Sequence, residues 1–251
     1  AVGWGSLRRF CAAERRCEKE AEKGVQYTHI EEGIFLSRPN RFVAEVEING
    51  KRETVHVKNT GRCRELLLPG SRVYLSAAEN PDRKTAFDLV AVQKGRRLIN
   101  MDSQAPNKAA EEWLRSGGFS PGVTLLKPEC RYGDSRFDFY GEREGEPPFF
   151  MEVKGVTLEE NGVVYFPDAP TERGIKHIRE LCRCLQAGYD AYLLFVIQMK
   201  DVRFFSPNDI THAAFGEALR EAASEGVQLM ARECYVTPDS MQIAGPVEIR
   251  L

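Results

Sequence analysis

The sequence predicts an α+β protein in which a small antiparallel β-barrel is followed by a larger domain with a mixed sheet. Two observations predict this class. Residues 30–98 contain short strand patterns separated by Gly and Pro turns, whereas residues 99–251 alternate between helical and strand patterns. A chain of 251 residues with 42% hydrophobic residues can fill the cores of two modest domains.

The first 29 residues form an N-terminal extension to which we assign no function. They include LRRFCAAERRCEKEAEKG, which is dense in charges of both signs and lacks the apolar stretch of a secretory signal. We expect a frayed helix or sequence added to the natural protein, because the chain begins at Ala1.

Composition limits the function classes that need to be considered. A net charge of −2 gives no bulk attraction to nucleic acid or to anionic membranes, so nucleic-acid binding requires a local cluster of cations. No segment reaches the roughly 18 apolar residues of a membrane span, so we expect no membrane partner. Seven cysteines without paired spacing favour reduced thiols in the cytoplasm and give little support to a zinc site.

The barrel is predicted from five or so strands in fewer than 70 residues. In RFVAEVEING the apolar residues alternate with glutamates, and the terminal Asn-Gly pair is a strong hairpin signal before RETVHV returns. Pro69-Gly70 marks a turn before SRVYLSA, and residues 80–82 mark another before TAFDLVAVQ. This pattern is typical of an OB-fold, although an SH3-like barrel would have a similar sequence.

The barrel sequence also carries a local excess of positive charge. Between Ile34 and Ser76 there are eight Arg or Lys residues against four Glu. Such an excess could follow a phosphate backbone, or it could simply solvate the outer face of the barrel. The loop KNTGRCRELLLPG contains Asn, Thr and Gly, which suit a turn. The candidate nucleic-acid-binding residues in and near this loop are Arg41, Lys58, Arg62 and Arg64.

The second domain is predicted to begin with a helix in NKAAEEWLRSGGF, followed by strands in TLLKPECRYG, RFDFYGE and PPFFMEVKGVTL. A second helix starts after PDAPT and ends at Gly188. The segment YDAYLLFVIQM is an unbroken apolar run of the kind needed by a strand covered on both faces. The helix HAAFGEALREAASEG and the strands VQLMARECYV and MQIAGPVEIRL complete a mixed α/β layer architecture.

Three charged residues interrupt the apolar pattern of adjacent strands in this domain. Glu152 and Lys154 share one face of their strand, and strand pairing can bring Asp138 beside Glu152. Two carboxylates beside a lysine suit Mg²⁺ or Mn²⁺, with the lysine placed to orient an attacking water. The alternative is an ordinary solvated strand face. A second acid-x-Lys match at Asp82 lies in a turn and has no upstream aspartate.

Several segments resemble the bacterial and archaeal sugar fermentation stimulation protein A family. They are RFDF, EVKGVTL, YFPDAPTERGIKHIREL, RFFSPNDI and NTGRCRELLLPGSRV. The resemblance extends from about Ile30 to Leu251, and the FPDAPTERGIKH block is far more specific than the acid-x-Lys string. It implies an OB-like N-terminal domain, a restriction-endonuclease-like PD-(D/E)xK nuclease domain, DNA binding and nuclease activity.

The same resemblance implies roles for individual residues. Asp138, Glu152 and Lys154 match the catalytic positions, with Asp138, Glu152 and the carbonyl of Val153 as metal ligands. Phe137 stands where the motif name has proline. A further carboxylate could come from Glu129, which we favour slightly, or from Glu111 or Glu112 on the first helix; the stronger alternative for each is a surface glutamate.

The second predicted helix offers further candidates. Arg173 and His177 are four residues apart and share one helix face, which could bind or orient the scissile phosphate together with Thr171 and Asp168. Alternatively, Asp168 and Thr171 cap the helix and His177 borders its packed stripe. We expect His29 and His212 to be surface residues.

Taken together, these observations favour a nucleic-acid-binding protein that is a divalent-metal-dependent nuclease acting on DNA, RNA or both. The alternative is a non-catalytic DNA-binding regulator of sugar (maltose) metabolism genes, and a third reading is a scaffold with a solvated charged strand. No helix-turn-helix or zinc-finger spacing supports sequence-specific operator reading. The sequence is compatible with a homodimer and leaves open strand preference and endo or exo action.

Overall fold

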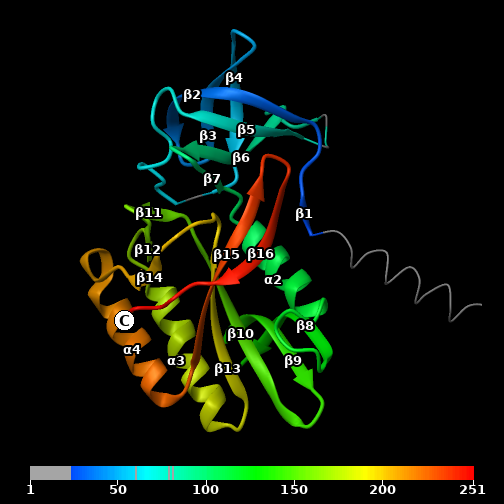
Figure 1. Cartoon of the computed structure of the whole chain (residues 1–251), viewed down its shortest axis with the longest axis vertical. Helices are drawn as coiled ribbons and strands as arrows, with labels where there is room; N and C mark the ends of the chain where they lie inside the picture. Colours follow the sequence, from blue (N-terminus) through cyan, green and yellow to red (C-terminus); the bar gives the residue numbers. More distant parts are fainter. Residues whose placement is uncertain (1–23, 60, 79, 81) are drawn as a thin grey trace, which may run out of the picture.

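The protein consists of a β-barrel stacked on a larger α/β domain, which lie one above the other along the long axis in Figure 1. The computed structural model describes residues 24–59, 61–78, 80 and 82–251. Most of the expected N-terminal extension, residues 1–23, therefore lies outside the described residues. The short strand β1 (Val25–Gln26) nevertheless joins the edge of the large sheet by pairing with β16 (Ser240–Pro246).

The barrel contains β2 (Ile30–Asn40), β3 (Val43–Ile48), β4 (Lys51–Val57), β5 (Arg72–Ala77), β6 (Phe87–Lys94) and β7 (Arg97–Asn100). Their order is β4-β3-β2-β5-β6-β7, and a parallel pairing of β4 with β6 closes the first five into a barrel. The expected alternation is present, because Ala44, Val46 and Ile48 are buried. Asn49 and Gly50 both have positive φ, as a tight hairpin turn requires.

The second domain is built on a seven-stranded mixed sheet of order β1-β16-β15-β13-β10-β9-β8. Its remaining strands are β8 (Val123–Tyr132), β9 (Ser135–Arg143), β10 (Glu146–Val156), β13 (Asp190–Ile197) and β15 (Gln228–Thr237). Strands β10, β13 and β15 are mutually parallel, and the other pairs are antiparallel. A small sheet of β11 (Leu158–Glu160), β12 (Val163–Phe166) and β14 (Phe204–Pro207) lies beside it.

Helices cover both faces of the large sheet (Figure 1). Helix α2 (Ala105–Arg115) packs on the face that carries Met151 and Val153, whereas α3 (Glu172–Gln186) and α4 (Asp209–Glu225) pack on the face that carries Phe150. Strand β13 is buried along almost its whole length, which confirms the strand predicted from the apolar run. The α+β class and the order of barrel and mixed-sheet domain are confirmed.

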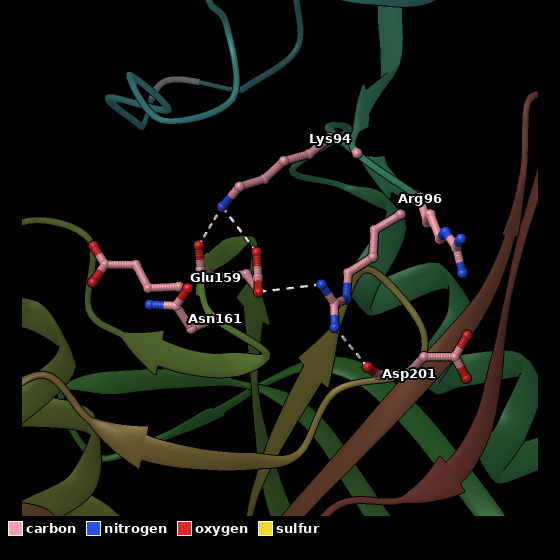
Figure 2. A pocket seen from close by; sticks show the side chains of 8 residues that line it. Lys94, Arg96, Glu159, Asn161 and Asp201 are labelled. Atoms are coloured by element: carbon pink, nitrogen blue, oxygen red, sulfur yellow. Dashed lines mark hydrogen bonds and ion pairs between the residues drawn. The ribbon is translucent and has the colours of Figure 1, made fainter.

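Buried polar contacts join the two domains. Glu159 of β11 is 3% exposed and receives Lys94 at 2.8 Å and Arg97 at 3.3 Å from the barrel hairpin β6–β7. Figure 2 shows Lys94 reaching Glu159 across the junction. Since these contacts link the β6–β7 hairpin to β11, they hold the barrel against the small sheet of the second domain.

A second group of contacts ties the junction near α2. The buried carboxylate of Asp102 pairs with Lys58 at 2.6 Å and accepts a hydrogen bond from Tyr27. Gln198 donates to the backbone carbonyls of Asn100 and Asp102. Lys58, expected at a nucleic-acid surface, is therefore engaged in the domain junction.

None of the helices in the described ranges combines the length and apolarity needed to cross a membrane.

Candidate active site

The candidate site lies where β9 and β10 part. The two strands pair from Glu146 opposite Arg143 to Met151 opposite Phe139, and the ladder then stops. Beyond that point the carboxylate of Asp138 takes the place of a strand partner, because its Oδ2 accepts the backbone N–H of Val153 at 2.7 Å. The gap between the strands is thus lined by a carboxylate.

Glu152 and Lys154 lie together on the α3 side of β10. The Oε1 of Glu152, a residue only 3% exposed, receives the Lys154 ammonium at 2.6 Å and also pairs with Nδ1 of His177. The other oxygen, Oε2, is buried and has no hydrogen-bond partner in the described part of the chain. Buried carboxylate oxygens are normally satisfied, so this oxygen points to a missing partner.

His177 holds Glu152 from helix α3. Nε of Arg173 lies 3.4 Å from Nε2 of His177, and a guanidinium can only donate. Nε2 must then accept, so the proton of a neutral imidazole is on Nδ1 and is donated to Glu152. Arg173 and His177 thus share a helix face as expected, but His177 contacts a carboxylate and is 5% exposed.

Asn107 of α2 holds the second carboxylate and was not anticipated from the sequence. Its Nδ2 donates to Oδ1 of Asp138 at 2.7 Å. Glu111, considered as a ligand on the same helix, pairs instead with Arg115 one turn later. A polar residue directly after Pro106, in the first turn of a helix that packs on the sheet, was the only sequence signal for Asn107.

The two carboxylates are tuned in opposite directions. Burial raises the pKa of Asp138, and the neighbouring charge of Glu152 raises it further, against the opposing hydrogen bonds from Val153 and Asn107. Burial alone would raise the pKa of Glu152, but the hydrogen bond from His177 and the charge of Lys154 outweigh it and lower that pKa. Adjacent carboxylates with divergent pKa values are common at functional sites.

Glu129 is not brought to this site. Its backbone has φ of 51°, and its carboxylate is 68% exposed and pairs with Arg136 at 3.3 Å. Within the described ranges, no group of three or more His, Cys, Asp or Glu side chains is placed to hold a metal. A metal held by Asp138 and Glu152 would therefore need backbone, water or substrate oxygens as its other ligands.

A hard divalent cation fits the residues that are present. Glu152, which carries the buried and unpartnered Oε2, is near enough to Asp138 for its charge to raise the pKa of that carboxyl. Val153, whose carbonyl was the expected third ligand, lies between Glu152 and Lys154 on β10. Mg²⁺ and Mn²⁺ prefer such oxygen ligands and keep several waters when they bind one or two carboxylates.

Three of the four candidate arginines and lysines of the barrel line one cavity. Arg41, Arg62 and Arg64 surround a volume of about 380 Å³. Arg38 shapes it, because its guanidinium donates to four backbone carbonyls of the surrounding loops, those of Arg41, Asn59, Gly61 and Arg62. The backbone N–H of Arg62 also reaches Asp168 at 3.3 Å, so this cavity adjoins the entrance of α3.

Two residues at the entrance of α3 have structural contacts. Thr171 caps the helix by accepting the N–H of Gly174 at 3.0 Å. Its own N–H lies 3.3 Å from Nδ1 of His212, whose side chain is 13% exposed and pairs with Glu172. The expectation that His212 is a surface residue is wrong, because α4 places it against the α3 terminus; His29 is exposed as expected.

Both parts of the chain match models of one protein family. Residues 36–101 match the SfsA N-terminal OB domain, and residues 104–240 match the sugar fermentation stimulation protein RE domain. The sugar fermentation stimulation protein homolog of Ruminiclostridium cellulolyticum is 56% identical over 227 residues, covering 90% of this chain and 100% of that protein. The Clostridium beijerinckii homolog is 54% identical with the same coverage.

A solved structure shares the whole arrangement. The structure of Pyrococcus furiosus SfsA in complex with Ca²⁺ matches with a TM-score of 0.81 and 27% identity, covering 91% of this chain and 100% of that one. The OB assignment of the barrel is thereby confirmed over the SH3-like alternative. The chain belongs to the sugar fermentation stimulation protein (SfsA) family, as its sequence motifs indicated.

Proposed function

We propose that the protein is a nucleic-acid-binding, divalent-metal-dependent nuclease that hydrolyses phosphodiester bonds of DNA, RNA or both. The observation that carries this proposal is the buried Oε2 of Glu152, which lacks a partner although Oε1 has two. Leaving a buried carboxylate oxygen unpaired costs about 1 to 3 kcal/mol or more, so its retention favours a ligand role.

Each residue of the site would have its own role. Asp138 and Glu152 would hold Mg²⁺ or Mn²⁺, which would supply a charge that stabilises developing negative charge on phosphoryl oxygens. The ammonium of Lys154, fixed by Glu152, is placed to orient a water and to attract the scissile phosphate. His177 and Asn107 keep the two carboxylates in position from opposite helices.

The barrel would hold the strand that is cut. Arg41, Arg62 and Arg64 line one cavity, and no ion pair engages them in the part of the chain that the structure describes. Free guanidinium groups bind phosphates well because they donate several hydrogen bonds in a fork. The Ca²⁺ complex of the Pyrococcus furiosus relative agrees with a hard cation as cofactor.

The test is cleavage of plasmid DNA, single-stranded DNA and RNA in Mg²⁺, Mn²⁺ or EDTA. Cleavage is expected only with metal, and it should disappear in Asp138→Asn and Lys154→Ala. Glu129→Gln is the matched control, since it removes an exposed carboxylate from the neighbouring strand. Cleavage that persists in EDTA, or in both site variants, would contradict the proposal.

A non-catalytic DNA-binding regulator remains the second candidate, favoured by the arginine-lined cavity, which does not depend on the carboxylates. The same assay separates the two. Retention of DNA without cleavage, at an affinity that falls as salt rises and does not depend on metal, would support the regulator.

A further inference from the structure

Charge is sorted between the two helices that pack side by side on one face of the sheet. On α3, every exposed position from 173 to 183 carries a positive charge: Arg173, Lys176, Arg179 and Arg183. On α4, every exposed charged position is acidic: Asp209, Glu217, Glu221 and Glu225. Surface helices that serve only solubility usually mix the two signs.

The spacing of the α3 cations makes the arrangement unfavourable for the helix itself. Lys176 and Arg179 are three residues apart, and the other neighbours in this row are three or four apart. Like charges at these spacings destabilise a helix by about 0.2 to 0.5 kcal/mol per pair. A row of like charges therefore needs a partner of opposite sign to be favourable.

Little within the chain neutralises this row. Arg183 pairs with Glu180, but within the described residues no carboxylate pairs with Arg173, Lys176 or Arg179. Lys176 donates only to the backbone carbonyl of Asp134. Three cations thus remain available to an anion from outside.

The row is continuous with the candidate active site. Arg173, its first member, contacts His177, which contacts Glu152. The four cations line a hollow of about 580 Å³ together with Asp134, Glu172 and Glu180. Ten residues of helix carry the row about 15 Å away from the site. Figure 1 shows α3 running from the level of the small sheet toward the end of the domain that is far from the barrel.

We propose that this row on α3, Arg173, Lys176, Arg179 and Arg183, binds the sugar-phosphate backbone of the nucleic acid on the side of the active site away from the barrel. The inference rests on the proposed function and adds a second backbone contact to the arginine cavity of the barrel. The strand would cross Asp138 and Glu152 between two cationic surfaces. A phosphodiester backbone suits the row because its charges repeat along a line, as the cations do.

The experiment measures the affinity of a fluorescein-labelled DNA duplex in EDTA as a function of salt concentration. Lys176→Ala/Arg179→Ala should weaken binding at low salt by about tenfold or more. It should also reduce the magnitude of the slope of log affinity against log salt concentration by about 1.8, since each lost phosphate contact contributes about 0.9 to that slope. Both side chains are exposed, so the melting temperature should remain unchanged.

Arg115→Ala/Arg220→Ala is the matched control, because it removes two helical arginines that lie outside the row and pair with acids. Its salt slope should equal that of the wild type. If the wild type binds and cleaves DNA but the row variant has the wild-type slope, or loses no more affinity than the control, the row is not a contact surface. If the wild type shows no salt-dependent binding, the proposed function itself fails.

Discussion

Glu152 and Glu159 are seven residues apart, and each is 3% exposed and paired with at least one cation, yet their carboxylate oxygens are partnered differently. Glu159 is fully satisfied: its Oε1 accepts from Gly162 and Arg97, and its Oε2 pairs with Lys94 (Figure 2). Glu152 concentrates two partners on Oε1 and leaves Oε2 with none among the described residues.

Under the proposed function, this difference distinguishes a structural carboxylate from one that would hold a ligand. At the junction, the cations neutralise Glu159 and join two domains, so nothing further is needed. At the site, His177 and Lys154 keep Glu152 ionised and oriented while one oxygen stays available. Burial and charge pairing alone therefore do not identify a functional residue; at Glu152 the unsatisfied carboxylate oxygen is the additional feature.

The largest effect that would separate the two glutamates is on cleavage. Glu152→Gln should lower the rate of phosphodiester hydrolysis by at least about 10² to 10³-fold, because the amide lacks the charge that holds the cation. Glu159→Gln should stay within a few-fold of the wild type. Single-turnover rates at saturating Mg²⁺ measure both; equal losses in the two variants would remove the distinction.

The second effect is on stability, and here the larger loss is expected at Glu159. Glu159→Ala leaves Lys94 and Arg97 without their carboxylate, and should lower the free energy of unfolding by about 2 to 3 kcal/mol. This is below the range for a fully buried pair, because the two cations are 31% and 30% exposed. Urea unfolding measures it, with exposed Glu160→Ala as control; an unchanged midpoint for Glu159→Ala would refute the junction role.

A smaller effect would show whether the other carboxylate is also held for a ligand. Asn107→Ala should lower cleavage by about tenfold, because a hydrogen bond to a charged group is worth roughly 1.5 kcal/mol. Asn107 also lowers the pKa of Asp138, so in its absence that pKa rises and ionisation requires a higher pH. Mn²⁺ binding of the variant should therefore move to higher pH, whereas Lys108→Ala should not shift it.

The smallest effect concerns pH and the junction. The hydrogen bond and charge of Lys94 and the other donors lower the pKa of Glu159 in spite of its burial. The resulting stabilisation is present above the unfolded value of about 4.3 and is lost as pH falls through the lower folded value. The stability of Glu159→Gln should thus decline less between about pH 5 and pH 3 than that of the wild type, as measured by urea unfolding.

Local patterns predicted the parts of the fold that depend on neighbouring residues. The Asn49-Gly50 turn, the buried run of β13 and the shared face of Glu152 and Lys154 all follow from strand geometry. The family resemblance of the motifs also held across both domains.

What could not be predicted depends on how separate elements meet. The contact of Asn107 with Asp138 requires the position of α2 on the sheet, and the role of Lys58 requires the docking of the barrel. Glu129 was considered because it lies on the strand before Asp138, but its side chain is exposed and pairs with Arg136 from a backbone of positive φ. A glutamate at such a backbone conformation has no signal in the sequence.

The most direct test of the account is calorimetric titration of Mn²⁺ into the wild type, Glu152→Gln and Glu159→Gln. We expect the wild type and Glu159→Gln to bind Mn²⁺ with similar affinity, and Glu152→Gln to lose that binding while remaining folded. Equal Mn²⁺ affinity in all three proteins, or none in the wild type, would show that the free oxygen of Glu152 is not a cation ligand.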